Sequence, residues 1–319
     1  MSSKVVVTGA SGFIGWALVS RLLLDGKFQP IAAARDTNCV AGRCSGVTFD
    51  LSVPGVLPLL DDVRVVVHAA ARVHVMDETA TDALAMFRSL NVDGTMRLAR
   101  HAADSGVARF IFISSIKVNG ESTAAGEPFT ADSVPAPVDP YGVSKYEAEE
   151  SLKKLSLETG MEVVIIRPPL VYGPGVKANF LSMMRWLSKG LPLPLGAIGN
   201  KRSLVAIGNL VDLIVTCIEH PAAANETFLV SDGDDLSTTQ LLRHLSRALG
   251  KRALLIPVPQ KLLIFVAGLL GRQSIAQRIC GSLQVNIEKN LEVLGWRPPV
   301  NVDQAMLQTA RYYLDEQTK

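Results

Sequence analysis

The stretch Val5-Val-Val-Thr-Gly9-Ala-Ser-Gly12-Phe-Ile-Gly15 joins a β-branched run to the start of a helical pattern. In that setting Gly9 permits a tight turn, and Gly12 lets backbone N–H groups approach a pyrophosphate at the helix N-terminus. Gly15 lets the helix lie close to the strand. We therefore predict a dinucleotide-binding loop whose contacts come from Gly9, Ser11, Gly12, Phe13, Ile14 and Gly15.

Short β-branched runs alternate with helical patterns along the chain. This alternation is typical of a parallel sheet flanked by helices, and several strands are apolar throughout, as expected when both faces are covered. We predict an α/β fold, a doubly wound, Rossmann-like parallel sheet with a smaller, mainly helical C-terminal lobe. The predicted strands are 4–8, 30–34, 63–68, 110–114, 163–167 and 226–231, and the predicted helices are 13–24, 83–105, 141–158 and 211–220.

The composition changes after Arg167. Residues 168–203 are rich in Pro and Gly, which suits loops that shape a cleft, and residues 237–319 have mainly helical patterns. We predict a dinucleotide-binding domain over 1–167 with a returning segment at 204–232. Residues 168–203 and 233–319 would form the substrate-binding lobe.

The bulk composition excludes several classes of protein. The chain has 319 residues, 48% of them apolar, and a net charge of +2, which gives no reason to expect a nucleic-acid partner. The four cysteines have neither disulfide-framework nor zinc spacing, and we predict no metal site. The N-terminus shows no signal peptide. We expect a cytoplasmic protein with free thiols.

An apolar run at 262–271 is half the roughly 20 residues that a membrane span needs. We therefore expect no transmembrane span. The first interpretation is a buried helix of the C-terminal lobe. The alternative is a hydrophobic patch that docks on a membrane or a membrane-bound partner, which would place the protein peripherally at the inner membrane.

Tyr141 and Lys145 lie four residues apart, about one helical turn, so both side chains leave the same helical face. A free tyrosine has a pKa near ~10, and a nearby ammonium favours the phenolate. We expect Lys145 to lower the pKa of Tyr141 toward the working range of a general acid or base. Ser115 ends a strand, where doubly wound sheets place residues that contact ligands.

The order of several segments resembles the extended short-chain dehydrogenase/reductase branch, the NAD-dependent epimerase/dehydratase family, which acts on nucleotide sugars. After the loop come Asn91-Val-Asp-Gly-Thr, Phe112-Ile-Ser-Ser115, Tyr141-x-x-x-Lys145 and the segment from Arg167 to Pro174. The segment from Arg202 to Asp212 closes the series. The resemblance implies that Ser115, Tyr141 and Lys145 are catalytic, and that the further cofactor contacts are Asp50, Leu51, Ala69, Ala70, Ala71, Asn91, Tyr141, Lys145 and Pro168.

The choice of nicotinamide cofactor depends on the end of the second strand, where Arg35 stands. An acidic residue there would bind the ribose hydroxyls, whereas a guanidinium can pair with a 2′-phosphate. We therefore expect NADP(H) to be preferred, with NAD(H) also accepted. Asp36 argues for the second cofactor, because a shift of one residue would make it the ribose ligand.

The resemblance also implies the substrate contacts. Asn179 matches an Asn that contacts the nucleotide-sugar diphosphate, and Arg202 matches an arginine that pairs with it. Either Arg278 or Arg272 would supply a second arginine, and Arg278 is the one we assign. Ser115 would donate a hydrogen bond to the substrate oxygen. We also assign Lys117 and Asn119 to substrate binding; Asn119 stands where many relatives have an aromatic residue. His68 reads as a packed strand-end histidine and His74 as a loop histidine.

Several net reactions fit these residues. Our first hypothesis is an NADPH-dependent reductase of the 4-keto group of a UDP-4-keto-6-deoxy-N-acetylhexosamine in O-antigen biosynthesis, with Tyr141 as the proton donor. The alternative is a UDP-hexose 4-epimerase with retained NAD. A dehydratase is disfavoured because Ile116 and Lys117 replace its carboxylate pair. A non-enzymatic NADP sensor or scaffold would usually lack the tyrosine or the lysine. The resemblance further implies a homodimer through helices 83–105 and 141–158.

Overall fold

The computed structural model describes residues 3–53, 55–72 and 83–318, except for the side chains of Cys39 and Ser274. Within these ranges seven parallel strands form one sheet in the order β3-β2-β1-β4-β5-β6-β9. The order reverses at β1 and β4, which makes the sheet doubly wound and confirms the predicted fold class. The strands are β1 (Lys4–Thr8), β2 (Gln29–Ala34), β3 (Ser45–Thr48), β4 (Val63–His68), β5 (Arg109–Ile113), β6 (Glu162–Arg167) and β9 (Thr227–Leu229).

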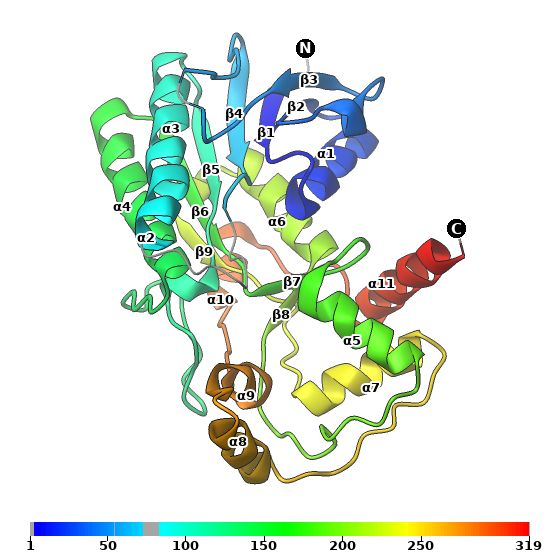
Figure 1. Cartoon of the computed structure of the whole chain (residues 1–319). Helices are drawn as coiled ribbons and strands as arrows, with labels where there is room; N and C mark the ends of the chain where they lie inside the picture. Colours follow the sequence, from blue (N-terminus) through cyan, green and yellow to red (C-terminus); the bar gives the residue numbers. More distant parts are fainter. Residues whose placement is uncertain (1–2, 54, 73–82, 319) are drawn as a thin grey trace.

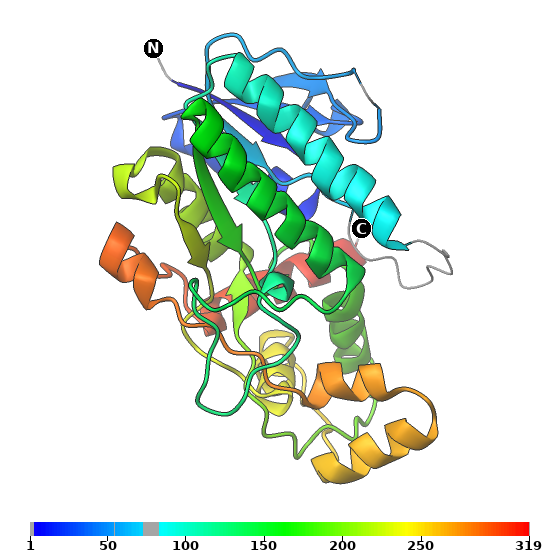
Figure 2. The same ribbon diagram turned by 90° about the vertical axis from the view of Figure 1, so that its left-hand side faces the viewer.

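Helices cover both faces of this sheet (Figure 1). On one face lie α1 (Phe13–Asp25) and α6 (Ile207–Glu219). On the other face α3 (Thr95–Asp104) and α4 (Pro140–Thr159) run side by side, as Figure 2 also shows. Because each face is covered, the central strands are apolar on both sides, as the sequence pattern predicted.

The predicted helix 83–105 consists of three consecutive segments. It begins as α2 (Ala83–Phe87), continues as a π-helical segment at Arg88–Gly94 and ends as α3. Segments of π-helix are rare and frequently occur at functional sites. Here the π-helical segment contains Asn91, one of the predicted cofactor residues.

Three strands were missed from the sequence. Strand β3 lies at the sheet edge, and its Ser-Gly-Val-Thr sequence carries little β signal. Strands β7 (Leu170–Tyr172) and β8 (Leu204–Ala206) pair in parallel as a separate two-stranded sheet. Their pairing joins segments distant in the chain, so local sequence patterns do not reveal it. Helix α5 (Ala178–Ser188) also lies in the segment that we expected to be mainly loops.

The C-terminal lobe has its own apolar core. Helices α5, α7 (Thr238–Ala248) and α11 (Val302–Gln317) pack around β7 and β8. Helix α7 begins with a capping box in which Ser237 and Gln240 bond each other's backbone N–H groups. The short helix α10 (Glu288–Leu294) lies against β9.

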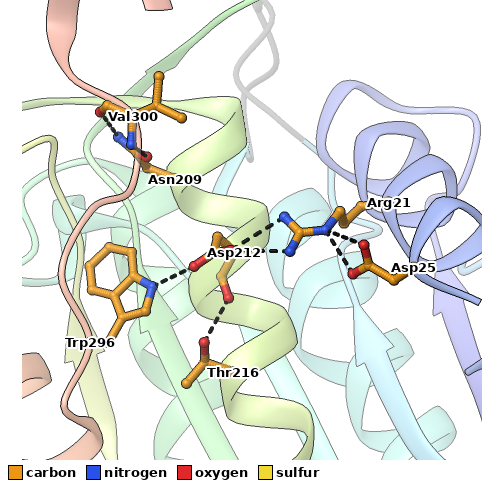
Figure 3. A network of polar contacts seen from close by, with 7 residues as sticks. All are labelled: Arg21, Asp25, Asn209, Asp212, Thr216, Trp296 and Val300. Carbon is orange, nitrogen blue, oxygen red and sulfur yellow. Dashed lines mark hydrogen bonds and ion pairs between the residues drawn. The ribbon is translucent and has the colours of Figure 1, made fainter. Parts of the chain in front are cut away.

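A polar network joins this lobe to the sheet (Figure 3). Asp212 on α6 accepts hydrogen bonds from Arg21 on α1 and, at 2.9 Å, from the Trp296 indole. Asn209, one turn earlier on α6, exchanges two hydrogen bonds with the Val300 backbone. Asn209 and Asp212, at the end of the family-like segment from Arg202 to Asp212, therefore have a structural role, since they hold the chain that leads into α11.

Helices α8 (Gln260–Leu269) and α9 (Gln273–Cys280) form a hairpin that projects from the lower end of the lobe (Figures 1 and 2). The prediction of a buried helix at 262–271 is wrong, because none of the described residues of α8 is buried. The helix packs mainly on α9, so its apolar residues remain exposed. Within the described ranges, every helix is too short or too polar to cross a bilayer.

Candidate active site

The glycine loop follows β1 and approaches the end of β4. Gly9 has a φ of +66°, and a Cβ atom there would lie 2.8 Å from the backbone nitrogen of Ala70. A Cβ atom on Gly15 would lie 2.2 Å from the Gly9 carbonyl oxygen. Both positions therefore require glycine, and the loop lies against the backbone of Ala69 and Ala70, which follow β4.

The first turn of α1 suits a pyrophosphate. Ser11 and Gly12 are exposed, Phe13 and Ile14 are partly buried, and Gly12 is the N-cap. Backbone N–H groups at a helix start have no partner within the helix, and the helix dipole favours an anion there. The residues present thus fit a dinucleotide cofactor.

The residues predicted to contact the adenosine lie next to this loop. Arg35 directly follows β2 and is exposed, and its charge acts on Asp50. Hydrogen bonds from the backbone N–H and hydroxyl of Ser52 hold the pKa of Asp50 below its usual value, and Arg35 adds to this effect. Leu51 packs against Gly94 of the π-helical segment.

Asn91 holds the loop after β4 in place. Its side chain accepts a 2.9 Å hydrogen bond from the Arg72 backbone N–H and donates to the Arg72 carbonyl. It also donates to the Ser144 hydroxyl on α4. Asn91 therefore connects the π-helical segment to α4 and to the loop that contains Ala71.

His68 is a packed strand-end histidine, as expected. Its Nδ1 lies 2.6 Å from the Thr8 hydroxyl and its Nε2 lies 3.0 Å from the Thr95 hydroxyl. Burial, reinforced by the Lys145 charge, lowers the pKa of His68 to about 3. The imidazole is therefore neutral and structural. His74 lies outside the described residues.

Tyr141 lies in the first turn of α4, close to Ser115. Asp139 is the N-cap of this helix and accepts a 2.6 Å hydrogen bond from the Gly142 N–H. The Tyr141 ring meets the edge of Phe87, with 5.9 Å between ring centroids. The Ser115 side chain lies near the phenol and acts to lower its pKa. The structure thus brings together the two groups that the sequence assigned to the reacting oxygen.

The pKa of Tyr141 differs from our expectation. Burial raises it to about 12, the Asp139 charge acts in the same direction, and the nearby Ser115 side chain opposes both. The sequence argument counted the nearby ammonium of Lys145 but not the loss of hydration around the phenol. By itself the protein therefore keeps Tyr141 protonated, as a proton donor would require.

Lys145 is buried beside the end of β5. Its Nζ donates a 2.8 Å hydrogen bond to the Ile113 carbonyl and lies 4.3 Å from the centroid of the Phe112 ring. Burial lowers its pKa to about 7, and the Glu149 charge opposes this shift. Lys145 can thus exchange a proton near neutral pH.

A buried ion pair behind these residues was missed from the sequence. Arg167 at the end of β6 binds Glu149 on α4 through two nitrogens, the closest contact being 2.5 Å. Ser114 also donates to Glu149. Glu149 follows Lys145 by four residues, so both leave the same face of the helix. This spacing was the signal that could have indicated a buried role for Glu149.

Our prediction of Asn119 as a substrate contact is not supported by its position. Asn119 is 1% exposed, accepts from Arg167 at 3.0 Å and donates to the Thr130 carbonyl. Its amide is therefore engaged within the protein and supports the buried pair. The sequence suggested the substrate because an aromatic residue often stands there in relatives, but Asn119 instead fills a buried polar position.

A line of charges leads from Tyr141 toward the C-terminal lobe. Lys117 forms ion pairs with Asp139 and with Glu121, the latter at 3.1 Å. Burial lowers the pKa of Arg202, and the charge of Glu121 acts in the opposite direction. Arg202 donates to the carbonyl oxygens of Arg278 and Gly281 at 3.0 and 3.2 Å. The structure thus brings Lys117, Arg202 and Arg278 into one region.

The other predicted contacts flank this region. Asn179 is exposed in the first turn of α5, and it is not the N-cap, which is Lys177. Pro168 is buried, and its carbonyl accepts from the Ile116 N–H at 3.0 Å, just beside Ser115. Within the described ranges, no cluster of His, Cys, Asp or Glu could hold a metal ion.

Comparison with known proteins agrees with this geometry. The chain is 49% identical over 320 residues to a UDP-glucose 4-epimerase from Vibrio cholerae, covering 98% of this chain and 96% of the relative. It is 27% identical to an N-acetyl-α-D-glucosaminyl-diphospho-ditrans,octacis-undecaprenol 4-epimerase from Escherichia coli O157:H7, covering 85% and 78%. The NAD-bound UDP-glucuronic acid 4-epimerase of Bacillus cereus has the same fold, with a TM-score of 0.79, 20% identity and coverage of 98% and 99%.

The family model described as "NAD dependent epimerase/dehydratase family" matches residues 5–231. This match spans the glycine loop, Ser115, Tyr141, Lys145 and Arg202, in the order on which the sequence resemblance rested. The chain is therefore an enzyme of the NAD dependent epimerase/dehydratase family.

Proposed function

We propose that the protein is a cytoplasmic UDP-hexose 4-epimerase. The observation that carries this proposal is its 49% identity over nearly the full chain to a UDP-glucose 4-epimerase. The neighbouring side chains of Ser115 and Tyr141, with Lys145 one helical turn further along α4, supply the acid/base groups that such a reaction requires. The sequence had placed a 4-keto reductase first and the epimerase second, and the comparison favours the epimerase.

In this proposal the chain's own residues move the proton. With oxidised NAD bound, the positive nicotinamide ring would favour the Tyr141 phenolate, which takes a proton from the 4-hydroxyl group of the sugar and later returns it to the same oxygen, while Ser115 hydrogen-bonds that oxygen. The glycine loop from Gly9 to Gly15 would hold NAD, which would supply the reversible hydride chemistry at carbon 4. Lys145 can accept or supply a proton beside Tyr141, because its pKa of about 7 lets it gain or lose a proton at neutral pH.

The substrate diphosphate would lie between α5 and the start of β8. Asn179 is exposed there, and the Arg202 guanidinium is suited to bidentate phosphate binding. Arg278 is assigned rather than Arg272 because its backbone carbonyl accepts directly from Arg202. Lys117 would help to select the sugar, since its ion pairs with Glu121 and Asp139 lie beside the Tyr141 turn.

The nicotinamide cofactor in this proposal is NAD, held through the reaction cycle. The guanidinium of Arg35 still supports the binding of NADP(H), because at that edge it can pair with a 2′-phosphate. Dissociation constants for NAD and NADP(H), measured for the wild-type protein and for Arg35→Asp, would show which cofactor the protein prefers. A preference for NADP(H) that Arg35→Asp reverses would establish Arg35 as the selecting residue.

A second candidate substrate is a hexosamine linked through a diphosphate to a polyprenol, which is the substrate class that the name of the E. coli relative gives. The observation that favours it here is the exposed apolar helix α8, joined through α9 to the predicted diphosphate arginine. A polyprenyl chain could contact such a surface. A homodimer formed through helices 83–105 and 141–158 is part of both versions of the proposal.

The test is to incubate the purified protein, without added cofactor, with UDP-glucose, UDP-galactose, UDP-N-acetylglucosamine and the polyprenyl-linked hexosamine in detergent. We expect a 4-epimer to form from at least one of the UDP-sugars, with no net change in nicotinamide absorbance. Epimerisation of the lipid-linked sugar alone would select the second candidate. Oxidation of NADPH by a UDP-4-keto-6-deoxy-N-acetylhexosamine without any epimerisation would establish the reductase instead.

A further inference from the structure

The hairpin of α8 and α9 carries an exposed apolar stripe. Leu262, Phe265, Val266, Leu269 and Leu270 recur at the spacing of one helical face, and all five are exposed, Phe265 by 62% and Leu269 by 73%. In a water-soluble helix this face would be the one that packs on the core. Here it faces away from the lobe, so it is available to another surface.

The segment of the chain that contains the hairpin carries positive charges alone. Residues 236–287 contain seven Lys and Arg residues and no Asp or Glu. Two of the cations flank the apolar stripe in the chain and are exposed: Lys261 at the start of α8 and Arg272 between the helices. A second protein would usually present both signs of charge, whereas an anionic bilayer presents one. An apolar face edged with cations matches an anionic lipid surface.

Hydrogen bonds connect the hairpin to the predicted substrate site. The Gln260 amide at the start of α8 donates to the Cys280 carbonyl at the end of α9, at 3.0 Å. From the lobe, Asn200 donates to Ile279 and Gly281, and Arg202 donates to Arg278. The base of the hairpin is therefore held in register with Arg202, while the hairpin itself projects from the lobe (Figure 2).

We propose that the α8–α9 hairpin docks on an anionic lipid bilayer, with the Leu262–Leu270 stripe in the interfacial layer and Lys261 and Arg272 on the lipid headgroups. Docking in this orientation brings the predicted diphosphate site around Arg202 close to the membrane surface. The surface does not take part in the acid/base chemistry at Tyr141. A failure of docking and a failure of epimerase activity are therefore distinguishable.

The test is flotation of the full-length purified protein with vesicles of phosphatidylglycerol and phosphatidylethanolamine, or of phosphatidylcholine alone. We expect binding to the anionic vesicles, weakened by salt, and little binding to phosphatidylcholine. The double variant Phe265→Ser/Leu269→Ser should reduce the partition coefficient at least about tenfold. Lys261→Glu/Arg272→Glu should also reduce it. The matched controls are Leu157→Ser and Lys153→Glu on α4, which replace exposed residues of the same types and should leave binding unchanged.

Several outcomes would overturn the proposal. One is the absence of binding to anionic vesicles by the wild-type protein. Another is equal binding by the hairpin variants and the α4 controls, which would place the contact elsewhere. A third is a wild-type oligomer that ignores vesicles and dissociates in Phe265→Ser/Leu269→Ser, because the stripe would then join two copies of this chain. Circular dichroism of each variant confirms that folding is intact before binding is compared.

Discussion

Lys145 Nζ donates a 2.8 Å hydrogen bond to the carbonyl oxygen of Ile113, the last residue of β5. Ser115 follows two residues after Ile113, and Tyr141 stands one helical turn before Lys145. This single bond therefore ties α4 to the end of β5 and fixes how the Tyr141 phenol meets the Ser115 hydroxyl. The catalytic proposal depends on that junction of helix and strand.

Replacing Tyr141 by Phe removes the group that would transfer the proton. We expect Tyr141→Phe to keep the fold and NAD binding and to lower kcat by a factor on the order of 10³. The control is Tyr312→Phe, which alters an exposed tyrosine on α11 and should leave turnover unchanged. Near-normal turnover in Tyr141→Phe would refute the assignment.

The ionisation of Tyr141 should depend on the cofactor. Its pKa of about 12 in the protein alone means that no phenolate forms at this residue below about pH 10. The positive nicotinamide ring of oxidised NAD would favour the phenolate and lower that pKa. Phenolate absorbance of the wild-type protein minus that of Tyr141→Phe, followed against pH with and without NAD, measures both effects. An identical titration in the two conditions would contradict this prediction.

Lys145 should make stability depend on pH. Its pKa is about 7 in the folded protein and 10.5 in an ordinary lysine, so the unfolded chain binds more protons between these values. Stability therefore rises with pH through this window. We expect Lys145→Met to flatten the rise, as measured by thermal unfolding at several pH values. Lys154→Met, an exposed change on the same helix, is the control and should keep the wild-type slope.

The buried pair of Glu149 and Arg167 should contribute strongly to stability. Removing only the guanidinium with Arg167→Met leaves a buried carboxylate without its partner, which should cost about 3–5 kcal/mol in urea unfolding. Lys153→Ala breaks the exposed pair with Glu150 and should cost no more than about 1 kcal/mol. Equal losses in the two variants would show that the pair is not buried in solution. The double change Glu149→Leu/Arg167→Met should restore part of the loss.

The close approach at Gly15 should be intolerant of any side chain. A methyl group there would lie 2.2 Å from the Gly9 carbonyl, so Gly15→Ala must displace α1 from the loop. We expect a loss of about 1–3 kcal/mol in stability and weaker NAD binding by calorimetry. Gly199→Ala is the control, because nothing lies within 4 Å of its Cβ position. Unchanged NAD affinity in Gly15→Ala would argue against the predicted pyrophosphate contact.

Local patterns were sufficient for most of the sheet. Strands β1 and β4 occupy the predicted residues, because continuous β-branched runs between turn residues specify a buried strand almost alone. The pairing of β7 with β8 was not predictable in this way, since each contributes three residues and depends on a distant partner. The role of Asn119 escaped prediction for a related reason. Its partner Arg167 lies 48 residues further along the chain.

By itself the sequence determined the glycine loop, the doubly wound sheet and the spacing of Tyr141 and Lys145, because each follows from residues that are close in the chain. The tertiary structure decided which charges are buried and which apolar residues are exposed. It raised the pKa of Tyr141 and lowered that of Lys145 through burial, and it left the apolar stripe of α8 uncovered. Both results depend on what surrounds a side chain, and segments far apart in the sequence supply those surroundings.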